Sequence, residues 1–276
     1  MSNGPQPTAL RPLASSQAGS HPAGETEIIH NAIAVASGKG GVGKTWLSIT
    51  LTHALANLGR KVVLLDGDLG LANIDIQLGI TPHVDLGQVL EQQWPLERAI
   101  TSYPDGGFDI VAGRSGSQTL ANMPTHRLLN LSSGISSLGR TYDHVVIDLG
   151  AGIDRPVRYL ATQSGRSIIV TTDEPTALTD AYAFIKLMRQ QGAHSRIGVV
   201  VNMAASREDG MRTYETLAKA CESFLQARPE LLAVIQRDSK VKDSIRAQMP
   251  LLIRHPGSHA GNDVEILARR LANASS

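Results

Sequence analysis

A run of eight residues from Gly38 to Thr45, with the sequence GKGGVGKT, carries the clearest chemistry in the chain. It lies between an apolar segment and a segment of helical period, so it would connect a strand to the start of a helix. Backbone amides at a helix N-terminus bind anions, and glycine provides such amides without side-chain bulk and with the backbone angles that they need. The sequence therefore predicts a phosphate-binding loop.

The same glycines fit a second template. Gly38, Gly40 and Gly43 also match the dinucleotide pattern G-x-G-x-x-G after a strand, and Asp66 lies near the distance expected of a ribose-binding acid. A NAD-binding oxidoreductase is therefore an alternative. The pair Lys44-Thr45 favours a nucleoside triphosphate, because a lysine on the outer phosphates and a hydroxyl on Mg²⁺ serve a triphosphate and are not needed for a pyrophosphate.

Three carboxylates follow predicted strands. Asp148 ends the run Val145 to Ile147 and suits a residue that orients Mg²⁺ and its water shell, with Thr45 as the hydroxyl ligand. Asp66 and Asp68 end another strand, so Asp66 is a further candidate beside the metal. Asp68 is the candidate that orients an attacking water. Acids at such positions also cap turns and helix starts, and for Asp66 alone that role is equally well supported.

Short apolar runs alternate with longer segments of helical period from Ile28 onward. The expected strands are Ala32–Ser37, Val62–Asp66, Phe108–Ala112, His144–Asp148, Ser167–Thr172, Ile197–Asn202 and Leu232–Ile235. The expected helices are Lys44–Leu58, Pro124–Gly139, Pro156–Gln163, Thr176–Gln191 and Gly210–Ala227. This alternation predicts an α/β fold with a doubly wound, mostly parallel sheet of about seven or eight strands and helices on both faces. Ligands of such sheets bind outside the carboxyl ends of the strands, where the glycine loop and the acids fall.

Composition limits the other options. The 276 residues suffice for one large domain, which we expect at 28–276, and the Pro-, Ser- and Gly-rich residues 1–27 are expected to form a disordered arm without the pattern of a secretory signal. The longest apolar runs are strand-sized and too short to cross a bilayer. A net charge of +1 favours no nucleic-acid partner. The single cysteine, Cys221, cannot form an internal disulfide, which suits the cytoplasm.

The loop contains a further lysine, Lys39, and with it the sequence resembles the deviant Walker A ATPases of the MinD/ParA group. The resemblance implies a P-loop NTPase of the SIMIBI-like class that binds ATP and Mg²⁺, closes as a homodimer around two nucleotides and hydrolyses ATP slowly. It assigns to Lys39 a contact with the partner's nucleotide, and to Asp68 a place in the first switch loop. Residues Asp148 to Gly152 match the second switch, and Asn202 matches the asparagine that binds adenine.

Taken together, these inferences define the candidate site. The catalytic candidates are Lys39, Lys44 and Asp68, and the metal candidates are Thr45, Asp66, Asp68 and Asp148. The nucleotide-binding candidates are Gly38, Lys39, Gly40, Gly41, Val42, Gly43, Lys44, Thr45, Trp46, Gly150 and Asn202.

Two further stretches, Asp68 to Asp75 and Glu174 to Lys186, are similar to the FlhG (also called FleN) branch, which regulates flagellar number and placement. This branch implies a flagellar assembly protein, a partner GTPase or a flagellar transcription regulator as partner. A MinD- or ParA-type ATPase that positions a septum, a chromosome or another cargo is the alternative, since it would share every nucleotide residue.

Three features depart from the family pattern. Trp46 stands where relatives carry a hydroxyl residue or asparagine, and residues 1–27 show no clear copy of the Asp-Gln-Ala segment with which many FlhG proteins stimulate a GTPase. The segment Asp263 to Ala272 is expected to be the last helix of the domain rather than a membrane-targeting helix, because its apolar stripe is small. A weak peripheral contact with a membrane or a cell pole is the most that its Arg269-Arg270 pair supports.

Overall fold

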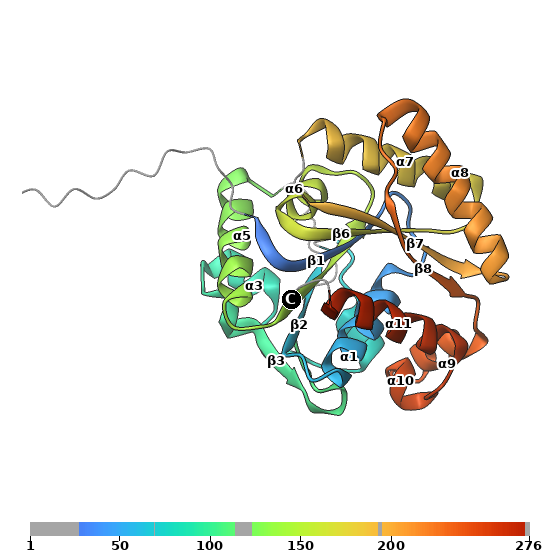
Figure 1. Ribbon diagram of the computed structural model, residues 1–276. Coiled ribbons are helices and arrows are strands. Elements are labelled where there is room, and N and C mark those ends of the chain that lie inside the picture. The colour runs from blue at the N-terminus through green and yellow to red at the C-terminus, as the bar shows by residue number, and fades with distance from the viewer. Residues whose placement is uncertain (1–27, 69, 114–122, 193–194, 274–276) are drawn as a thin grey trace, which may run out of the picture.

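The apolar runs form the strands of one eight-stranded sheet, and the computed structural model describes residues 28–68, 70–113, 123–192 and 195–273 (Figure 1). The expected disordered arm, residues 1–27, lies outside the described residues. The strands are β1 (Ile29–Ser37), β2 (Val62–Gly67), β3 (Ile100–Tyr103), β4 (Phe108–Val111), β5 (His144–Ala151), β6 (Ser164–Thr171), β7 (Arg196–Ala204) and β8 (Glu230–Gln236).

Helices and short 3₁₀ turns connect these strands. The α-helices are α1 (Lys44–Asn57), α2 (Ile74–Leu78), α3 (Leu86–Gln92), α5 (Thr125–Gly139), α6 (Arg155–Gln163), α7 (Pro175–Gln190), α8 (Arg207–Leu225), α9 (Ser239–Arg246), α10 (Leu251–Arg254) and α11 (His259–Asn273). The 3₁₀ turns are η1 (Leu96–Ala99) and η2 (Pro104–Gly106). The small helices α2, α3, α9 and α10 were not among the expected elements.

The strand order is β3-β4-β2-β5-β1-β6-β7-β8. Strand β3 pairs antiparallel with β4, and the other described pairs are parallel. The predicted doubly wound, mostly parallel sheet is therefore confirmed. The sequence prediction missed β3, because this edge strand is four residues long and only Tyr103 among them is buried.

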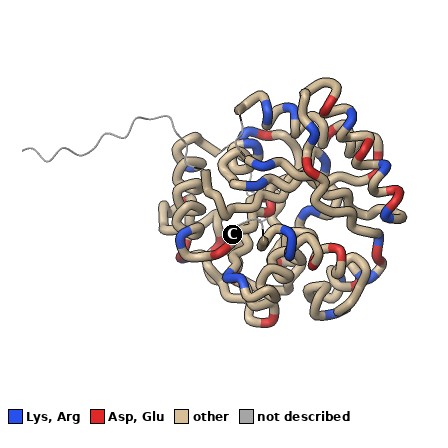
Figure 2. The backbone as a smooth tube through the Cα atoms, viewed as in Figure 1, with Lys and Arg blue, Asp and Glu red and all other residues tan. Residues whose placement is uncertain are grey.

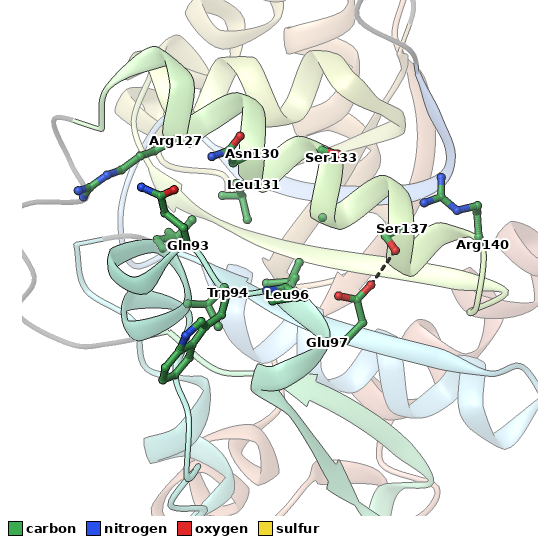
Figure 3. Close-up of a pocket in the computed structure, with 14 residues that line it drawn as sticks. Gln93, Trp94, Leu96, Glu97, Arg127, Asn130, Leu131, Ser133, Ser137 and Arg140 are labelled. Atoms are coloured by element: carbon green, nitrogen blue, oxygen red, sulfur yellow. Dashed lines mark hydrogen bonds between the residues drawn. The ribbon is translucent and has the colours of Figure 1, made fainter. Parts of the chain in front are cut away.

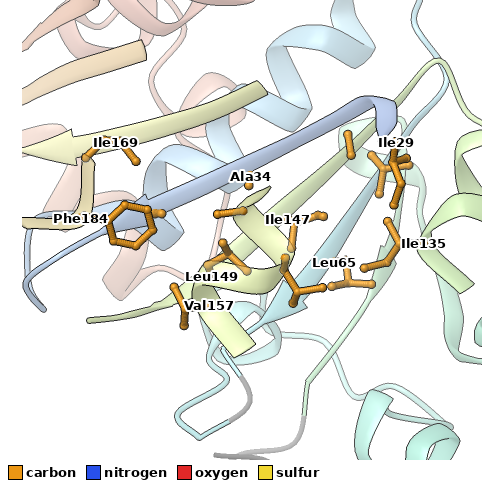
Figure 4. Packing of buried hydrophobic residues seen from close by; sticks show 14 of the residues in the cluster. Ile29, Ala34, Leu65, Ile135, Ile147, Leu149, Val157, Ile169 and Phe184 are labelled. Atoms are coloured by element: carbon orange, nitrogen blue, oxygen red, sulfur yellow. The ribbon is translucent and has the colours of Figure 1, made fainter. Parts of the chain in front are cut away.

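Two apolar layers cover the two faces of the sheet, and the side chains of β1 alternate between them. Ala32 and Ala34 belong to the layer beneath α3, α5, α6, α7 and α8, whereas Ile33 and Val35 face the layer beneath α1, α10 and α11. Figure 4 shows the first layer, where Ile135 of α5 and Phe184 of α7 pack over the sheet. Because successive side chains of a strand point to opposite faces, a continuous apolar run marks a strand covered on both sides.

Helix α1 lies deep in the second layer, with a continuous run of buried residues from Trp46 to Leu55. Helix α11 packs against α1 and β8, and Leu267 and Leu271 are buried there. The expected last helix of the domain, Asp263–Ala272, is therefore longer than predicted and closes the core. Among the described residues, no helix is long and apolar enough to cross a membrane.

Charged residues are mixed over the surface. Figure 2 shows Lys and Arg interleaved with Asp and Glu in the view drawn, and several of them form ion pairs, such as Arg254 with Asp243 and Arg270 with Glu230. This mixture agrees with the small net charge of +1.

Candidate nucleotide-binding site

The glycine loop connects β1 to α1, and its backbone adopts angles that favour glycine. Gly41 has φ of 81° and Gly43, the N-cap of α1, has φ of 88°. A Cβ atom at Gly43 would also lie 2.4 Å from the side-chain nitrogen of Asn202. Both the backbone angle and the close contact therefore require glycine at position 43, directly before the first amide groups of a buried helix.

Asn202 near the end of β7 holds the loop from the side. Its Nδ2 donates a hydrogen bond of 2.8 Å to the carbonyl oxygen of Val42, and its side chain is buried. A carbonyl can only accept a hydrogen bond, so the amide orientation is determined, and Oδ1 remains the acceptor available to a ligand.

Two carboxylates lie side by side at the carboxyl ends of neighbouring strands. Asp66 of β2 and Asp148 of β5 are register partners, and both are buried. Burial raises the pKa of Asp148 to about 6, opposed by the charge of Lys44 and by hydrogen bonds from the Thr45 and Ser48 hydroxyls. The Ser48 Oγ donates to Asp148 over 2.9 Å. Asp148 thus ties the start of α1 to the centre of the sheet.

Asp66 supports the loop that follows β2. Its carboxylate accepts hydrogen bonds from the backbone amides of Asp68 (3.2 Å), Asn73 (3.0 Å) and Ile74 (3.1 Å). Burial first, and then repulsion by Asp148, raise the pKa of Asp66 to about 8, while these amides act in the opposite direction. The structure therefore gives Asp66 the turn-capping role that the sequence left open.

Asp68, unlike Asp66 and Asp148, lines the open pocket. Its Oδ1 accepts hydrogen bonds from the amides of Leu71 (2.9 Å) and Gly70 (3.3 Å), which bend the loop after β2. A Cβ atom at Gly150 of β5 would lie 3.3 Å from the same oxygen, so glycine there leaves room for this carboxylate.

A pocket of about 580 Å³ opens over these groups. The predicted site residues that line it are Gly40, Gly41, Gly43, Lys44, Thr45, Trp46, Asp68 and Asn202. The predicted residues outside its lining are Gly38, Lys39, Val42, Asp66, Asp148 and Gly150. Of these, Gly38 packs against α7, where a Cβ atom would lie 2.4 Å from the carbonyl oxygen of Asp180.

The far side of the pocket comes from residues that were not among the predicted site residues. They are Leu71, Asn73 and Gln77 near α2, Ala151 and Met203 at strand ends, and Gln236, Arg237, Asp238, Val241, Lys242, Ile245 and Ala260 around α9. Arg237 and Asp238 directly follow β8. The rule that ligands bind at carboxyl strand ends would have found these two, but the residues of α9 needed the tertiary structure.

Lys39 does not point into the pocket of its own chain. Its Nζ donates to Glu174 Oε2 at 2.5 Å and to the Thr176 hydroxyl at 2.9 Å, at the start of α7. This hydrogen bond lowers the pKa of Glu174. The lysine is 38% exposed, so its contact is at the surface.

Trp46, the third residue of α1, lines the pocket but is 5% exposed. Its indole Nε1 is buried and has no hydrogen-bond partner among the described residues. The ring packs in the apolar layer with Leu47 and Ile49 of the same helix. Trp46 therefore contributes an apolar wall to the pocket.

The oxygen groups of the site fit a hard divalent cation that takes most of its ligands from nucleotide phosphates and water. Within the described residues, no three acidic, histidine or cysteine side chains gather closely enough to hold a metal ion by themselves. The Thr45 hydroxyl beside Asp148, with Asp68 nearby, offers the few oxygen groups that Mg²⁺ takes from a protein when phosphates and water complete its shell. These residues fit Mg²⁺ bound together with a nucleotide.

Comparison with known proteins identifies the same domain. Residues 33–251 match the model of the CobQ/CobB/MinD/ParA nucleotide binding domain. The chain is 37% identical over 239 residues to the antiactivator FleN of Pseudomonas aeruginosa, covering 87% of this chain and 85% of FleN. It is 31% identical over 243 residues to the flagellum site-determining protein YlxH of Helicobacter pylori, covering 87% and 81%.

The fold has a solved counterpart in the septum site-determining protein MinD of Pyrococcus horikoshii, complexed with Mg-ADP. The two share a TM-score of 0.74 and 26% identity over 89% of this chain and 98% of that one. Both the resemblance to the MinD/ParA group and that to its FlhG/FleN branch are thereby confirmed. The chain belongs to the CobQ/CobB/MinD/ParA family of nucleotide-binding domains and is one of its P-loop ATPases.

Proposed function

We propose that this chain is an ATP-driven dimerisation switch that regulates flagellar number or placement. The observation that supports nucleotide binding is the pocket at the carboxyl edge of the sheet, which is lined by Lys44 at the start of α1, Asp68 after β2 and Asn202 of β7. The similarity to FleN and YlxH supports the flagellar part.

Each group has a task that its surroundings support. The amides of Gly41 to Lys44 and the Lys44 ammonium hold the phosphates, while Asp148 positions Lys44 and Thr45. Mg²⁺, held by Thr45, Asp148 and Asp68, would neutralise charge on the outer phosphates. Asp68 orients the water that attacks the γ-phosphorus in line with the departing ADP.

The residues at the expected position of the nucleotide base favour adenine over guanine. Asn202 commits its Nδ2 to Val42 and keeps Oδ1 as an acceptor, which suits the adenine amino group and not the guanine carbonyl. Met203 and Val241 add apolar surface for the base. ATP is therefore the favoured nucleotide.

Lys39 contacts the nucleotide of the opposite chain in the proposed dimer. In the single chain, Glu174 and Thr176 hold its ammonium at the surface of α7. When two chains face each other across their nucleotides, Lys39 exchanges these partners for the phosphates of the opposite chain. A partner protein that prefers one of the two forms then reads the nucleotide state.

The partner is a flagellar assembly protein, a flagellar GTPase or a transcription regulator, by analogy with an antiactivator and a site-determining protein. The switch would act in the cytoplasm, with at most a peripheral membrane contact.

Nucleotide titration tests the site. ATP binding should be lost in Lys44→Ala and retained in Lys219→Ala, an exposed lysine on α8. Binding of NAD that survives Lys44→Ala would instead favour the dinucleotide alternative.

Sizing of the protein tests the switch. We expect a monomer with ADP, a partly dimeric protein with ATP, and a stable dimer when Asp68→Ala is combined with ATP, because hydrolysis no longer resets it. Asp105→Ala in η2 is the matched control. A chain that stays monomeric throughout would refute the shared site.

Counting flagella in a deletion strain tests the biological role. Altered flagellar number or position is expected, with restoration by the wild-type gene and not by Lys44→Ala. Unchanged flagella together with displaced septa or chromosomes would favour the MinD- or ParA-type positioning alternative.

A further inference from the structure

A second concavity lies on the side of the sheet covered by α3 and α5, and we call it the α5 groove. It has a volume of about 440 Å³ and runs between α5 and the segment from Val89 to Glu97. Figure 3 shows Arg127, Ser133 and Arg140 following one another along α5, opposite Trp94. The groove shares no lining residue with the nucleotide pocket.

Small residues on α5 keep the groove open. A Cβ atom at Gly134 would lie 3.1 Å from the Cβ of Leu96, so glycine lets α5 and η1 approach at the floor. Ser133 and Ser137 line the wall with short side chains, and the Ser137 hydroxyl donates to Glu97 over 2.6 Å. The small size of these side chains on α5 therefore leaves space for a ligand above the floor of the groove.

The chemistry of the groove is that of a peptide site. Trp94 is half-buried, with the Arg98 guanidinium 4.0 Å from its ring centroid on one side. Arg127 and Arg140 stand at opposite ends (Figure 3) and form no ion pair within the described part of the chain. The serine hydrogen bond and then the charge of Arg140 lower the pKa of the groove residue Glu97. An aromatic wall between two cationic ends suits an extended segment with proline or leucine and a nearby carboxylate.

The N-terminal segment of the same chain begins at one end of this groove. The Asn31 amide of β1 donates to the carbonyl oxygens of Gly139 and Tyr142, each over 2.8 Å. A Cβ atom at Gly139 would lie 3.2 Å from Ile29, so these residues are in close contact. Residues 1–27 therefore join the domain beside Arg140.

The composition of residues 1–27 matches the groove. Apart from Met1, their large aliphatic residues are Leu10 and Leu13, which flank Pro12, and their acids are Glu25 and Glu27 next to the attachment point. Proline-containing segments dock on aromatic grooves at little entropic cost, and burial of the leucine side chains adds a favourable hydrophobic contribution.

The length of the connection also fits. The stretch between Leu13 and Ile29 can span at most about 50 Å when extended. The groove follows α5 from Arg140 to Arg127, which is about 20 Å at the rise of a helix. Tethering at this range gives an effective concentration on the order of millimolar, so a weak contact is sufficient for occupancy.

We propose that the segment Leu10 to Leu13 of the same chain occupies the α5 groove, with its leucines against Trp94 and with Glu25 and Glu27 toward Arg140. A partner protein that binds the N-terminal segment must then displace it from the groove. This inference does not depend on nucleotide binding.

Disulfide trapping in the full-length protein tests the contact. Cys221 is buried, and burial raises the pKa of its thiol to about 11, so it should not take part. The pair Leu13→Cys with Asn130→Cys should form an intramolecular disulfide at least about ten-fold faster than Leu13→Cys with the exposed control Lys219→Cys, as expected from local concentration. Adding Leu10→Asp should remove that advantage.

Equal rates for the two pairs, or an advantage that survives Leu10→Asp, would overturn the proposal. A disulfide that joins two chains would assign the groove to a second copy and would also overturn it. A second measurement leaves the groove residues unchanged. Acrylamide quenching of tryptophan fluorescence should increase in the double variant Leu10→Asp/Leu13→Asp, because Trp94 becomes more accessible while Trp46 stays buried. Unchanged quenching would contradict occupancy.

Discussion

Asn202 combines two tasks in a single side chain. Its amide nitrogen donates to Val42 of the glycine loop, its oxygen remains free to accept a hydrogen bond, and the residue lines the pocket. Strand-end position and family resemblance pointed to this residue, but the fixed orientation of its amide came from a contact 160 residues away in sequence.

We expect Asn202→Ala to lower ATP affinity about ten-fold, because a buried acceptor and a loop contact are both lost. Loss of base recognition should reduce ATP binding more than GTP binding, whereas loss of loop support alone should reduce both equally. Isothermal titration with each nucleotide measures this difference, with Asn57→Ala at the exposed end of α1 as control. An unchanged ATP-to-GTP ratio would argue against base recognition.

The paired acids Asp66 and Asp148 make the nucleotide-free protein sensitive to pH. Both carboxyl pKa values are raised above the ordinary 3.8, mainly by burial. The folded state therefore retains protons that the unfolded chain has already released, so their contribution to stability is complete below pH 4 and is lost as pH rises through about 6 and about 8.

We expect the unfolding temperature of the nucleotide-free protein to fall between pH 6.5 and pH 8.5, by a few degrees. Asp66→Asn should show a smaller fall, because it cannot ionise. The interval avoids the buried His53 and His144, whose lowered pKa values make them destabilising at lower pH. A fall of equal size in Asp66→Asn would contradict this account; differential scanning calorimetry provides the measurement.

At the scale of elements, the start of α7 controls the signature lysine. Glu174 is the N-cap residue of α7 and, with Thr176, binds Lys39 of the glycine loop. Helix α7 also packs on α8, so this contact connects the loop to the far half of the sheet. Releasing Lys39 is therefore one step in forming the proposed dimer.

Glu174→Gln should favour the ATP-bound dimer by a few-fold, because exposed ion pairs contribute little individually. Sedimentation at several protein concentrations in the presence of ATP would measure the change, with Glu208→Gln on α8 as a matched exposed control. If Glu174→Gln instead weakens the dimer, Glu174 belongs to the interface and does not restrain Lys39.

At the scale of the whole molecule, α11 is part of the core. Leu267 is fully buried between α1 and the sheet, whereas its neighbour Ile266 is 53% exposed. A helix that detached to bind a membrane would leave α1 uncovered. The proposed function therefore needs no departure of α11 from the domain.

Leu267→Ala should destabilise the protein by about 2–5 kcal/mol, because it leaves a cavity in the second apolar layer. Ile266→Ala should change stability by no more than about 0.5 kcal/mol. Urea unfolding of both variants measures the difference. Similar stabilities for the two would mean that α11 is only loosely attached.

The parts of the molecule that depend on local order can be predicted from the amino-acid sequence. Glycine spacing and Lys44-Thr45 specify a triphosphate loop, and apolar runs of strand length specify a buried parallel sheet whose ends carry Asp68 and Asp148. These features follow from backbone angles and side-chain periodicity, which act within a few residues. The edge strand β3 is the exception, because four mostly unburied residues leave no such pattern.

The contacts between these parts follow from the tertiary arrangement and could not be predicted from local patterns. Lys39 binds Glu174, Asp66 accepts hydrogen bonds from the loop after β2, and Asn202 donates to Val42. Residues of α9 complete the lining of the pocket. In each of these contacts, the order of the strands or the course of a loop brings the two residues together in space, and the residues next to them in sequence do not. The hydrogen bonds and the burial of these side chains depend on which elements the sheet brings together. That arrangement is a property of the whole chain, so no short segment encodes it.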